Sequence, residues 1–210
     1  MLTRYELQNI IRGNEPSWKG EVIQAITCHL GREKGSIQAN PESKQFRIEE
    51  EEILSRFAEI NGLWLDEPDE QFFIGEGAEQ RVFGHSDPSY VIKTNHALFY
   101  ACWEDYLNNL LIHNYFFPHL AYELLGFSKT GEGLMAIIKQ PFVQTGPATN
   151  LDNVRDFLVA NGFVHRRAND YFHPGIKIIL EDLHDENVLT KEGCLMFIDT
   201  VFYLMPDFWD

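Results

Sequence analysis

Three groups of residues in this chain of 210 residues have types and spacing suited to one chemistry, the transfer of a phosphoryl group from ATP. Gly75 and Gly77 stand between two short apolar runs, where a backbone without side chains can approach phosphates closely. Lys93 ends the apolar run Tyr90-Val91-Ile92. A lysine in that position can neutralise and align the phosphates.

The third group places acidic and amide side chains at the ends of apolar runs. Asp182 and Asn187 follow the run 176–180, and Asp199 follows the run 195–198. Mg²⁺ prefers hard oxygen ligands of this kind. A carboxylate in such a site also orients the acceptor hydroxyl and takes its proton. The sequence therefore predicts one site that binds ATP and Mg²⁺.

Each group also has a plainer interpretation. Glycine pairs are common in hairpin turns, Lys93 can extend to solvent from a strand end, and Asp182 alone is a frequent turn residue. The joint occurrence of the three groups in this order favours phosphoryl transfer. His184 lacks a second histidine at metal-ligand spacing and is interpreted as a residue that fixes its loop. No GxSxG or HExxH motif supports a hydrolase or a zinc enzyme.

The elements that must position these residues follow from the hydrophobic periodicity. Helical spacing dominates the first 65 or so residues, and the last of these helices ends at Asn61-Gly62. Its acidic run Glu49 to Glu52 is interpreted as a solvated helix face, with an interaction motif as the alternative. From 72 to 142 short apolar runs alternate with turns, which predicts strands with one long helix over 97–115. A helix over about 150–160 and further short strands follow.

The segment Asp182-Leu183-His184-Asp185-Glu186-Asn187-Val188-Leu189, followed by Ile198-Asp199-Thr200, resembles the protein-kinase-like superfamily. It is similar to aminoglycoside-phosphotransferase-type kinases and to the kinase-like domain of polyvalent proteins from mobile elements and phages. The resemblance covers about 72–201. It implies an α+β, two-lobed kinase-like fold with an antiparallel sheet and one long helix in an N-lobe over 67–144. A reduced C-lobe over 145–210 follows the N-lobe, and a helical extension over 1–66 precedes it.

The resemblance also implies roles for individual residues. Gly75 and Gly77 are implied to flank the phosphates, and Val82 to contact the adenine. Lys93 is implied to bind the α- and β-phosphates, with Glu104 as its partner. The segment 140–144, which includes Gln140 and Phe142, is implied to be the hinge that binds the adenine. Asp182 is implied to be the catalytic base, while Asn187 and Asp199 hold Mg²⁺.

Departures from the usual pattern argue against an ordinary protein kinase. Leu180 and Glu181 replace the usual His and Arg before the catalytic aspartate, and Thr200-Val201 replaces Phe-Gly after the metal aspartate. Only 11 residues follow Asp199, so no activation segment or peptide-binding subdomain is expected. The alternative function is a catalytically inactive, pseudokinase-type module that binds a nucleotide or a protein.

Composition limits the partners. The chain has 17 basic and 32 acidic residues and a net charge of −15, which argues against binding nucleic acid or an anionic membrane. Mimicry of DNA would explain the charge but not the motif. The expected partners are a nucleotide and an unknown small-molecule or protein acceptor.

The remaining expectations concern location and assembly. The three separated cysteines and the absence of a signal peptide predict a soluble protein of a reducing cytoplasm. The C-terminal segment is apolar, and either the N-terminal helices or a second subunit of a homodimer is expected to cover it; its residues are Phe202, Leu204, Met205, Phe208 and Trp209.

Overall fold

The first part of the protein is helical, as the periodicity predicts. The computed structural model describes residues 3–36, 43–144 and 146–210, and within them the N-terminal helices are α1 (Arg4–Ile11), α2 (Glu21–Glu33) with the short turn η1 (Lys34–Ser36), and α3 (Lys44–Asn61). Thr3 caps α1 through a reciprocal capping box with Glu6. Gly62, with φ of 65°, ends α3 in the left-handed conformation that glycine adopts without strain.

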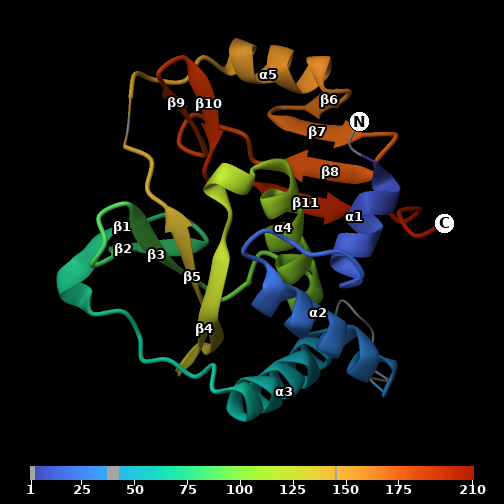
Figure 1. Ribbon diagram of the computed structural model, residues 1–210, viewed down its shortest axis with the longest axis vertical. Coiled ribbons are helices and arrows are strands. Elements are labelled where there is room, and N and C mark those ends of the chain that lie inside the picture. Colours follow the sequence, from blue (N-terminus) through green and yellow to red (C-terminus); the bar gives the residue numbers. More distant parts are fainter. Residues whose placement is uncertain (1–2, 37–42, 145) are drawn as a thin grey trace.

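A five-stranded antiparallel sheet forms the first lobe (Figure 1). After the turn η2 (Glu70–Phe72), its strands in spatial order are β1 (Phe73–Glu76), β2 (Gln80–Gly84), β3 (Tyr90–Asn95), β5 (Gly133–Pro141) and β4 (Glu123–Thr130). A hairpin joins β4 to β5. Lys93 on the central strand β3 pairs with Val82 on one side and Ile138 on the other, which holds it in the rigid middle of the sheet.

The long helix, α4 (Trp103–Phe116), begins later than the predicted start at residue 97. Ala97 has a φ of 54°, so the chain turns there instead of entering a helix. The Trp103 N–H donates to the Glu50 carboxyl group at 2.7 Å, which places an acidic side chain at the positive end of α4. The interpretation of the acidic run as a solvated face was therefore wrong for Glu50, whose side chain is fully buried.

The second lobe follows the turn η3 (Pro118–Leu120), strands β4 and β5, and a connecting segment. It contains α5 (Leu151–Ala160), a four-stranded sheet in the order β11 (Val201–Leu204), β8 (Ile178–Glu181), β7 (Asp170–His173) and β6 (Val164–Arg167), and the hairpin of β9 (Val188–Lys191) and β10 (Cys194–Phe197). Asp182 directly follows β8, Asn187 directly precedes β9, and Asp199 lies between β10 and β11. The order of the strands thus brings Asp182, Asn187 and Asp199 into one region of the second lobe.

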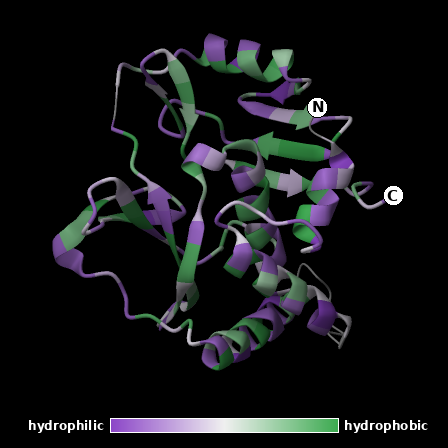
Figure 2. Ribbon diagram, in the orientation of Figure 1, coloured by the Kyte–Doolittle hydropathy of each residue, from purple (hydrophilic) through white to green (hydrophobic). Residues whose placement is uncertain are grey.

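One hydrophobic core joins the helices and both lobes. Leu7, Leu30 and Leu54 of the N-terminal helices belong to the same buried cluster as Leu110 of α4 and Phe202 of β11. α4 lies in the middle of the molecule, with α1 and α2 along one side of it (Figure 1), and the apolar character of β8 is visible in Figure 2. The predicted boundaries after residues 66 and 144 divide the sequence, whereas the core is common to all three segments.

Helix α1 covers the apolar C-terminal segment. Phe202 and Phe208 are buried. Arg4 donates to the main-chain carbonyls of Asp207 and Asp210, and the Arg12 guanidinium lies 4.4 Å from the centre of the Trp209 ring. The sequence left two possibilities for covering the C-terminal segment, the N-terminal helices or a second subunit. Helix α1 covers it, so no second subunit is needed to bury these residues.

The mixed architecture of helices and antiparallel sheets confirms the predicted α+β class. Within the described parts of the chain, no helix combines the length and the apolar character needed to cross a membrane. All three cysteines are free thiols.

Candidate active site

An open cleft of about 530 Å³ lies between the two lobes. It brings together residues singled out from all three sequence groups, namely Gly77, Val82, Lys93, Gln140, Phe142, Asn187 and Asp199. Trp209, at the end of the chain, packs on Arg12 of α1 and does not fill the cleft. The strands and loops of both lobes therefore converge where the sequence predicts a site.

The glycine turn between β1 and β2 borders this cleft. Gly75 pairs with Val82 within the ladder, and the Gly77 N–H donates to the Gln80 carbonyl at 2.9 Å. A Cβ atom added to either glycine would meet no atom within 4 Å, so the space beside the turn is open. Gly77 lines the cleft, whereas Gly75 lies further back in β1.

Lys93 lies at the floor of the cleft with 5% of its surface exposed. Its Nζ donates to the Ile198 carbonyl at 3.0 Å and lies 5.6 Å from the centre of the Tyr122 ring. Burial lowers the pKa of the Lys93 ammonium, and the negative charge of Asp199 opposes that shift. The Lys93 amino group thus lies within the electrostatic influence of Asp199.

The two residues expected to bind a metal are joined through the backbone. The N–H groups of Ile198 and Asp199 both donate to the Asn187 carbonyl, at 3.0 and 3.2 Å. This arrangement ties the end of β10 to the loop before β9. The spacing of Asn187 and Asp199 is therefore set by main-chain hydrogen bonds and does not depend on their side chains.

The loop between β8 and β9 has a strained start and many internal contacts. Asp182 has a φ of 62°, which is rare for a residue with a side chain. Asn187 Nδ2 donates to the Asp182 carboxylate at 3.0 Å and lies 3.1 Å from His184 Nε2. His184 therefore fixes the loop, as its sequence context predicts. Because Nδ2 of Asn187 is engaged with Asp182, Oδ1 remains available as an oxygen ligand.

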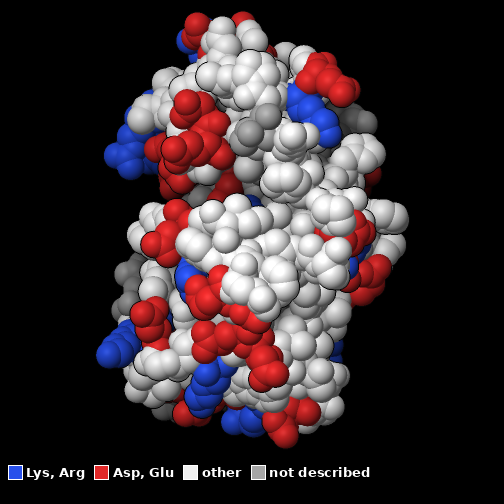
Figure 3. All heavy atoms as spheres, turned by 90° about the vertical axis from the view of Figure 1, so that its left-hand side faces the viewer, with Lys and Arg blue, Asp and Glu red and all other residues white. Residues whose placement is uncertain are grey.

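Acidic side chains gather around Asp199. Gln80 Nε2 donates to Asp199 Oδ1 at 2.8 Å. Burial, followed by the charges of Asp199 and Asp182, raises the pKa of the neighbouring Glu79 to about 7. Figure 3 shows further acidic side chains on both sides of the waist between the lobes. Negative charge is thus concentrated where a cation is expected.

The hinge residues line the cleft, but part of their hydrogen-bonding capacity is used within the protein. The carboxamide of Gln140 is buried and donates to the Leu120 carbonyl at 3.0 Å. The Phe142 N–H donates to the Ser89 carbonyl at 2.8 Å. Gln140 therefore supports the hinge through packing, and the Phe142 ring, which is 46% exposed, provides an apolar surface toward the cleft.

Glu104 does not pair with Lys93, so that prediction was wrong. Its carboxylate forms an ion pair with Lys34, next to the end of α2. Because α4 begins at Trp103, Glu104 lies in its first turn and is directed toward the N-terminal helices. Tyr106 lies closer to the active-site acids: burial, then the charges of Asp199 and Glu79, raises the pKa of its hydroxyl.

Two buried residues, His113 and Thr200, form a contact next to the site that the sequence did not predict. His113 Nε2 lies 3.1 Å from the Leu120 carbonyl and Nδ1 lies 2.8 Å from Thr200 Oγ1. A carbonyl only accepts, so Nε2 carries the proton and the Thr200 hydroxyl donates to Nδ1. Burial lowers the pKa of His113 to about 3, which keeps the ring neutral. The residue after Asp199 is thereby anchored to α4.

Comparison with known proteins places this site in a family. A model of the family described as serine/threonine/tyrosine kinases found in polyvalent proteins matches residues 47–206. The match starts within α3, ahead of the predicted boundary after residue 66, and includes both lobes. No curated protein matches the chain. Since the match covers most of the chain, this protein belongs to the family of serine/threonine/tyrosine kinases found in polyvalent proteins.

Proposed function

We propose that the protein is an ATP- and Mg²⁺-dependent phosphotransferase that transfers the γ-phosphoryl group of ATP to a hydroxyl group. The observation that carries this proposal is the convergence of Lys93, Asn187 and Asp199 on one open cleft beside a glycine turn. Membership of a kinase family supports the reaction class. Phosphoryl transfer depends on positioning and charge stabilisation, which these residues are suited to provide.

The cleft is lined by both apolar and charged groups. Val82, Val91, Phe142 and Leu189 line it with apolar surface, which suits the flat adenine ring. Lys93 and the main chain around Gly77 also line it, and the phosphates would bind to them. In this proposal the buried ammonium of Lys93 holds phosphate oxygens, because few water molecules compete for it there.

The donor set fits Mg²⁺. Within the residues that the structure describes, no cluster of three or more His, Cys, Asp or Glu side chains could hold a metal ion alone. Mg²⁺ is commonly held by one or two protein oxygens together with phosphate oxygens. Asn187 Oδ1 and the Asp199 carboxylate would provide the protein oxygens. Bound there, Mg²⁺ would neutralise charge that develops on the phosphates during transfer.

Asp182 is the proposed catalytic base. Its carboxylate is oriented by Asn187 Nδ2 at 3.0 Å and His184 Nε2 at 3.5 Å. Its side chain is 59% exposed, so an acceptor hydroxyl can reach it. In this role Asp182 would hold the hydroxyl in line with the phosphoryl group and accept its proton. The family description points to serine, threonine or tyrosine hydroxyls, and the acidic surroundings disfavour an anionic acceptor.

A second candidate function is a nucleotide-binding or protein-interaction module without catalysis. It is favoured by the pairing of Glu104 with Lys34, which leaves Lys93 without a glutamate partner from α4. The Gln80 hydrogen bond to Asp199 also occupies one oxygen of the expected metal ligand. Binding and turnover must therefore be measured separately.

Binding is tested by thermal-shift titration with Mg-ATP on the wild type, Lys93→Met and Asp199→Asn. A ligand at 100 times its Kd stabilises the folded state by about 2.7 kcal/mol, so the wild type should show a clear rise in Tm. Lys93→Met and Asp199→Asn should both lose most of this rise in Tm. Asp66→Asn, the same change at an exposed acid outside the cleft, should keep the full rise. Absence of stabilisation in the wild type, or equal stabilisation in Asp199→Asn, would overturn the nucleotide site.

Turnover of ATP then separates the two functions. Asp182→Asn should retain the Mg-ATP stabilisation but lose about 100-fold or more in turnover, because it removes the general base. If wild type and Asp182→Asn turn over ATP at the same rate, catalysis by Asp182 is excluded. If the wild type binds Mg-ATP but does not turn it over, the module without catalysis is the better description.

A further inference from the structure

A second cavity, of about 1040 Å³, lies in the second lobe and is separate from the cleft of the candidate active site. It is enclosed by the ends of α4 and α5, the start of α1, and strands β7, β8 and β11. It shares no lining residue with the cleft that contains Lys93. The proposed phosphotransferase reaction therefore leaves this cavity without a role.

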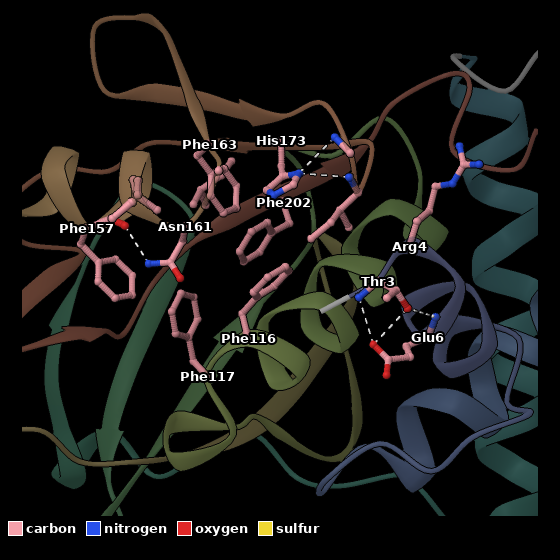
Figure 4. Close-up of a pocket in the computed structure, with 16 residues that line it drawn as sticks. Thr3, Arg4, Glu6, Phe116, Phe117, Phe157, Asn161, Phe163, His173 and Phe202 are labelled. Atoms are coloured by element: carbon pink, nitrogen blue, oxygen red, sulfur yellow. Dashed lines mark hydrogen bonds between the residues drawn. The ribbon is translucent and has the colours of Figure 1, made fainter. Parts of the chain in front are cut away.

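Phenylalanine rings form most of the cavity wall. Figure 4 shows them directed toward a common space; they are Phe116, Phe117, Phe157, Phe163 and Phe202. Phe116 and Phe202 are stacked, with ring centres 5.6 Å apart and planes 16° apart. Leu158, Leu180 and Phe202 are almost completely buried and belong to the hydrophobic core, so the cavity lies directly on that core.

The charged groups at the rim are already paired within the protein. The Glu6 carboxylate accepts from Thr3 and from the Tyr115 hydroxyl, at 3.0 Å each. Arg4 donates to the carbonyls of Asp207 and Asp210 at 3.2 and 3.1 Å. A charged ligand would have to break these contacts or remain unpaired in an apolar site, which is costly.

Two polar side chains at the rim, His173 and Asn161, each have one atom without a hydrogen-bond partner among the described residues. His173 Nδ1 accepts the N–H groups of Gly175 and Ile176, at 3.2 and 3.0 Å, so the neutral ring carries its proton on Nε2. Asn161 Nδ2 donates to the Phe157 carbonyl at 2.7 Å, which leaves Oδ1 as an acceptor. The rim therefore offers His173 Nε2 as a donor and Asn161 Oδ1 as an acceptor, while Arg4 and Glu6 are paired within the protein.

We propose that this cavity binds an uncharged small molecule with a flat aromatic body and one or two polar atoms. Ligand sites are typically concave, about 300–1,000 Å³ in volume, and lined by apolar and aromatic side chains with a few placed polar groups. Flat aromatic ligands gain stacking energy against phenylalanine rings that a flexible chain would not. The inference does not depend on the proposed phosphotransferase activity.

An occupant of this cavity would touch the strands that carry the active-site acids. Leu180 lines the cavity two residues before Asp182, and Phe202 lines it three residues after Asp199. These two residues face each other in the β8–β11 ladder. Ligand binding and the geometry of the cleft therefore share a structural element.

The test uses N-phenyl-1-naphthylamine, an uncharged fused aromatic amine whose fluorescence rises in apolar surroundings. The wild type should bind it saturably at one site per chain. Phe157→Asp, which adds a carboxylate to the cavity wall at a position that is 43% exposed, should weaken binding at least tenfold. Val159→Asp makes the same change on the same helix, at a position 55% exposed that does not line the cavity, and should bind as the wild type does.

Further variants keep the test decisive. If circular dichroism shows that Phe157→Asp does not fold, Ala160→Trp takes its place in the test. This variant adds bulk at the rim of the cavity and should also weaken probe binding. Phe142→Asp, in the other cleft, should leave the probe affinity unchanged. The proposal is overturned if the wild type does not bind the probe, if Phe142→Asp alone abolishes binding, or if sedimentation shows a dimer that the cavity variants dissociate.

Discussion

The segment that carries Asp199 is anchored both before and after this residue. The Ile198 and Asp199 N–H groups bind the Asn187 carbonyl, and Thr200 donates to His113 on α4. Thr200 stands where the usual protein-kinase pattern has phenylalanine. A polar contact to a neutral, buried histidine anchors this segment to α4.

Thr200→Val should destabilise the protein although the two side chains have almost the same shape. The change leaves His113 Nδ1 buried without a donor, which costs about 1–3 kcal/mol. Tm should fall by about 5 °C in a thermal melt. Thr27→Val is the matched control, because Thr27 is also buried but donates only to a carbonyl of its own helix. Equal Tm values for the wild type and Thr200→Val would contradict the anchoring role.

Glu50 makes stability depend on pH. Burial is the main cause that raises its pKa to about 7, above the ordinary value of 4.5. Below pH 4.5 both the folded and the unfolded state are protonated at Glu50. As the pH rises toward 7, the unfolded state releases its proton first, so this group lowers the free energy of unfolding across that window and not beyond it.

Glu50→Gln should therefore gain stability over the wild type as the pH rises from 5 to 7.5. The amide oxygen can still accept the Trp103 N–H, while the cost of ionising a buried acid disappears. The difference in unfolding free energy between variant and wild type should change by about 2 kcal/mol across the window, measured by urea denaturation. Glu52→Gln, at an exposed position of the same helix, should give a difference that is flat with pH.

Among the secondary structure elements, α3 organises the start of α4. Arg47 donates to the carbonyls of His96, Ala97 and Tyr100, which lie in the connection between β3 and α4. Its Nε also lies 3.5 Å from the Glu51 carboxylate on the same helix. Arg47 is the first residue of the family match, so the family unit includes this clamp. The helix that the sequence analysis assigned to an extension thus supports the element beside the active site.

Arg47→Met should loosen the connection without removing the apolar stem of the side chain. Three carbonyls lose a charged donor, which should cost about 2–3 kcal/mol and speed hydrogen exchange of the amides over 96–103. Arg56→Met, at an exposed position of the same helix, should leave those rates unchanged. Unaltered exchange over 96–103 in Arg47→Met would show that the connection is held by other contacts.

Considered as a whole molecule, the protein has one core, to which residues from α1, α2 and α3 belong. Leu30 on α2 and Leu54 on α3 are fully buried in the same cluster as the α4 residues Leu107 and Leu110. Elements that share a core of this kind are expected to unfold together, even though the sequence divides into an extension and two lobes.

Calorimetry should accordingly show a single unfolding transition. Leu30→Ala, in the N-terminal helices, should lower the Tm of that entire transition, because the cavity it leaves costs about 2–5 kcal/mol. Leu98→Ala, at a position that is 62% exposed, should change it little. A separate low-temperature transition in Leu30→Ala would mean that the helices form an independent unit, as the predicted boundary after residue 66 implies.

The chemistry of the cleft could be predicted because it depends on local patterns. Gly77, Asn187 and Asp199 stand next to the ends of strands, and Lys93 lies within β3; short apolar runs with turn residues identify these strands from sequence alone. The order of these groups matched a known family, and the family comparison and the α+β architecture confirmed that resemblance. Composition and motif order were therefore sufficient to determine the kind of protein and its candidate active-site residues.

Only the tertiary structure decided which partner each of several side chains has. Glu104 pairs with Lys34, Glu50 caps α4, and Thr200 binds His113, in each case across at least 53 positions of the sequence. The phenylalanine-lined cavity likewise draws its walls from α1, α4, α5 and the last sheet. Such contacts depend on how helices rotate and pack around a common core, and no local periodicity encodes that rotation. The sequence thus determined the candidate active-site residues, while packing determined what supports them.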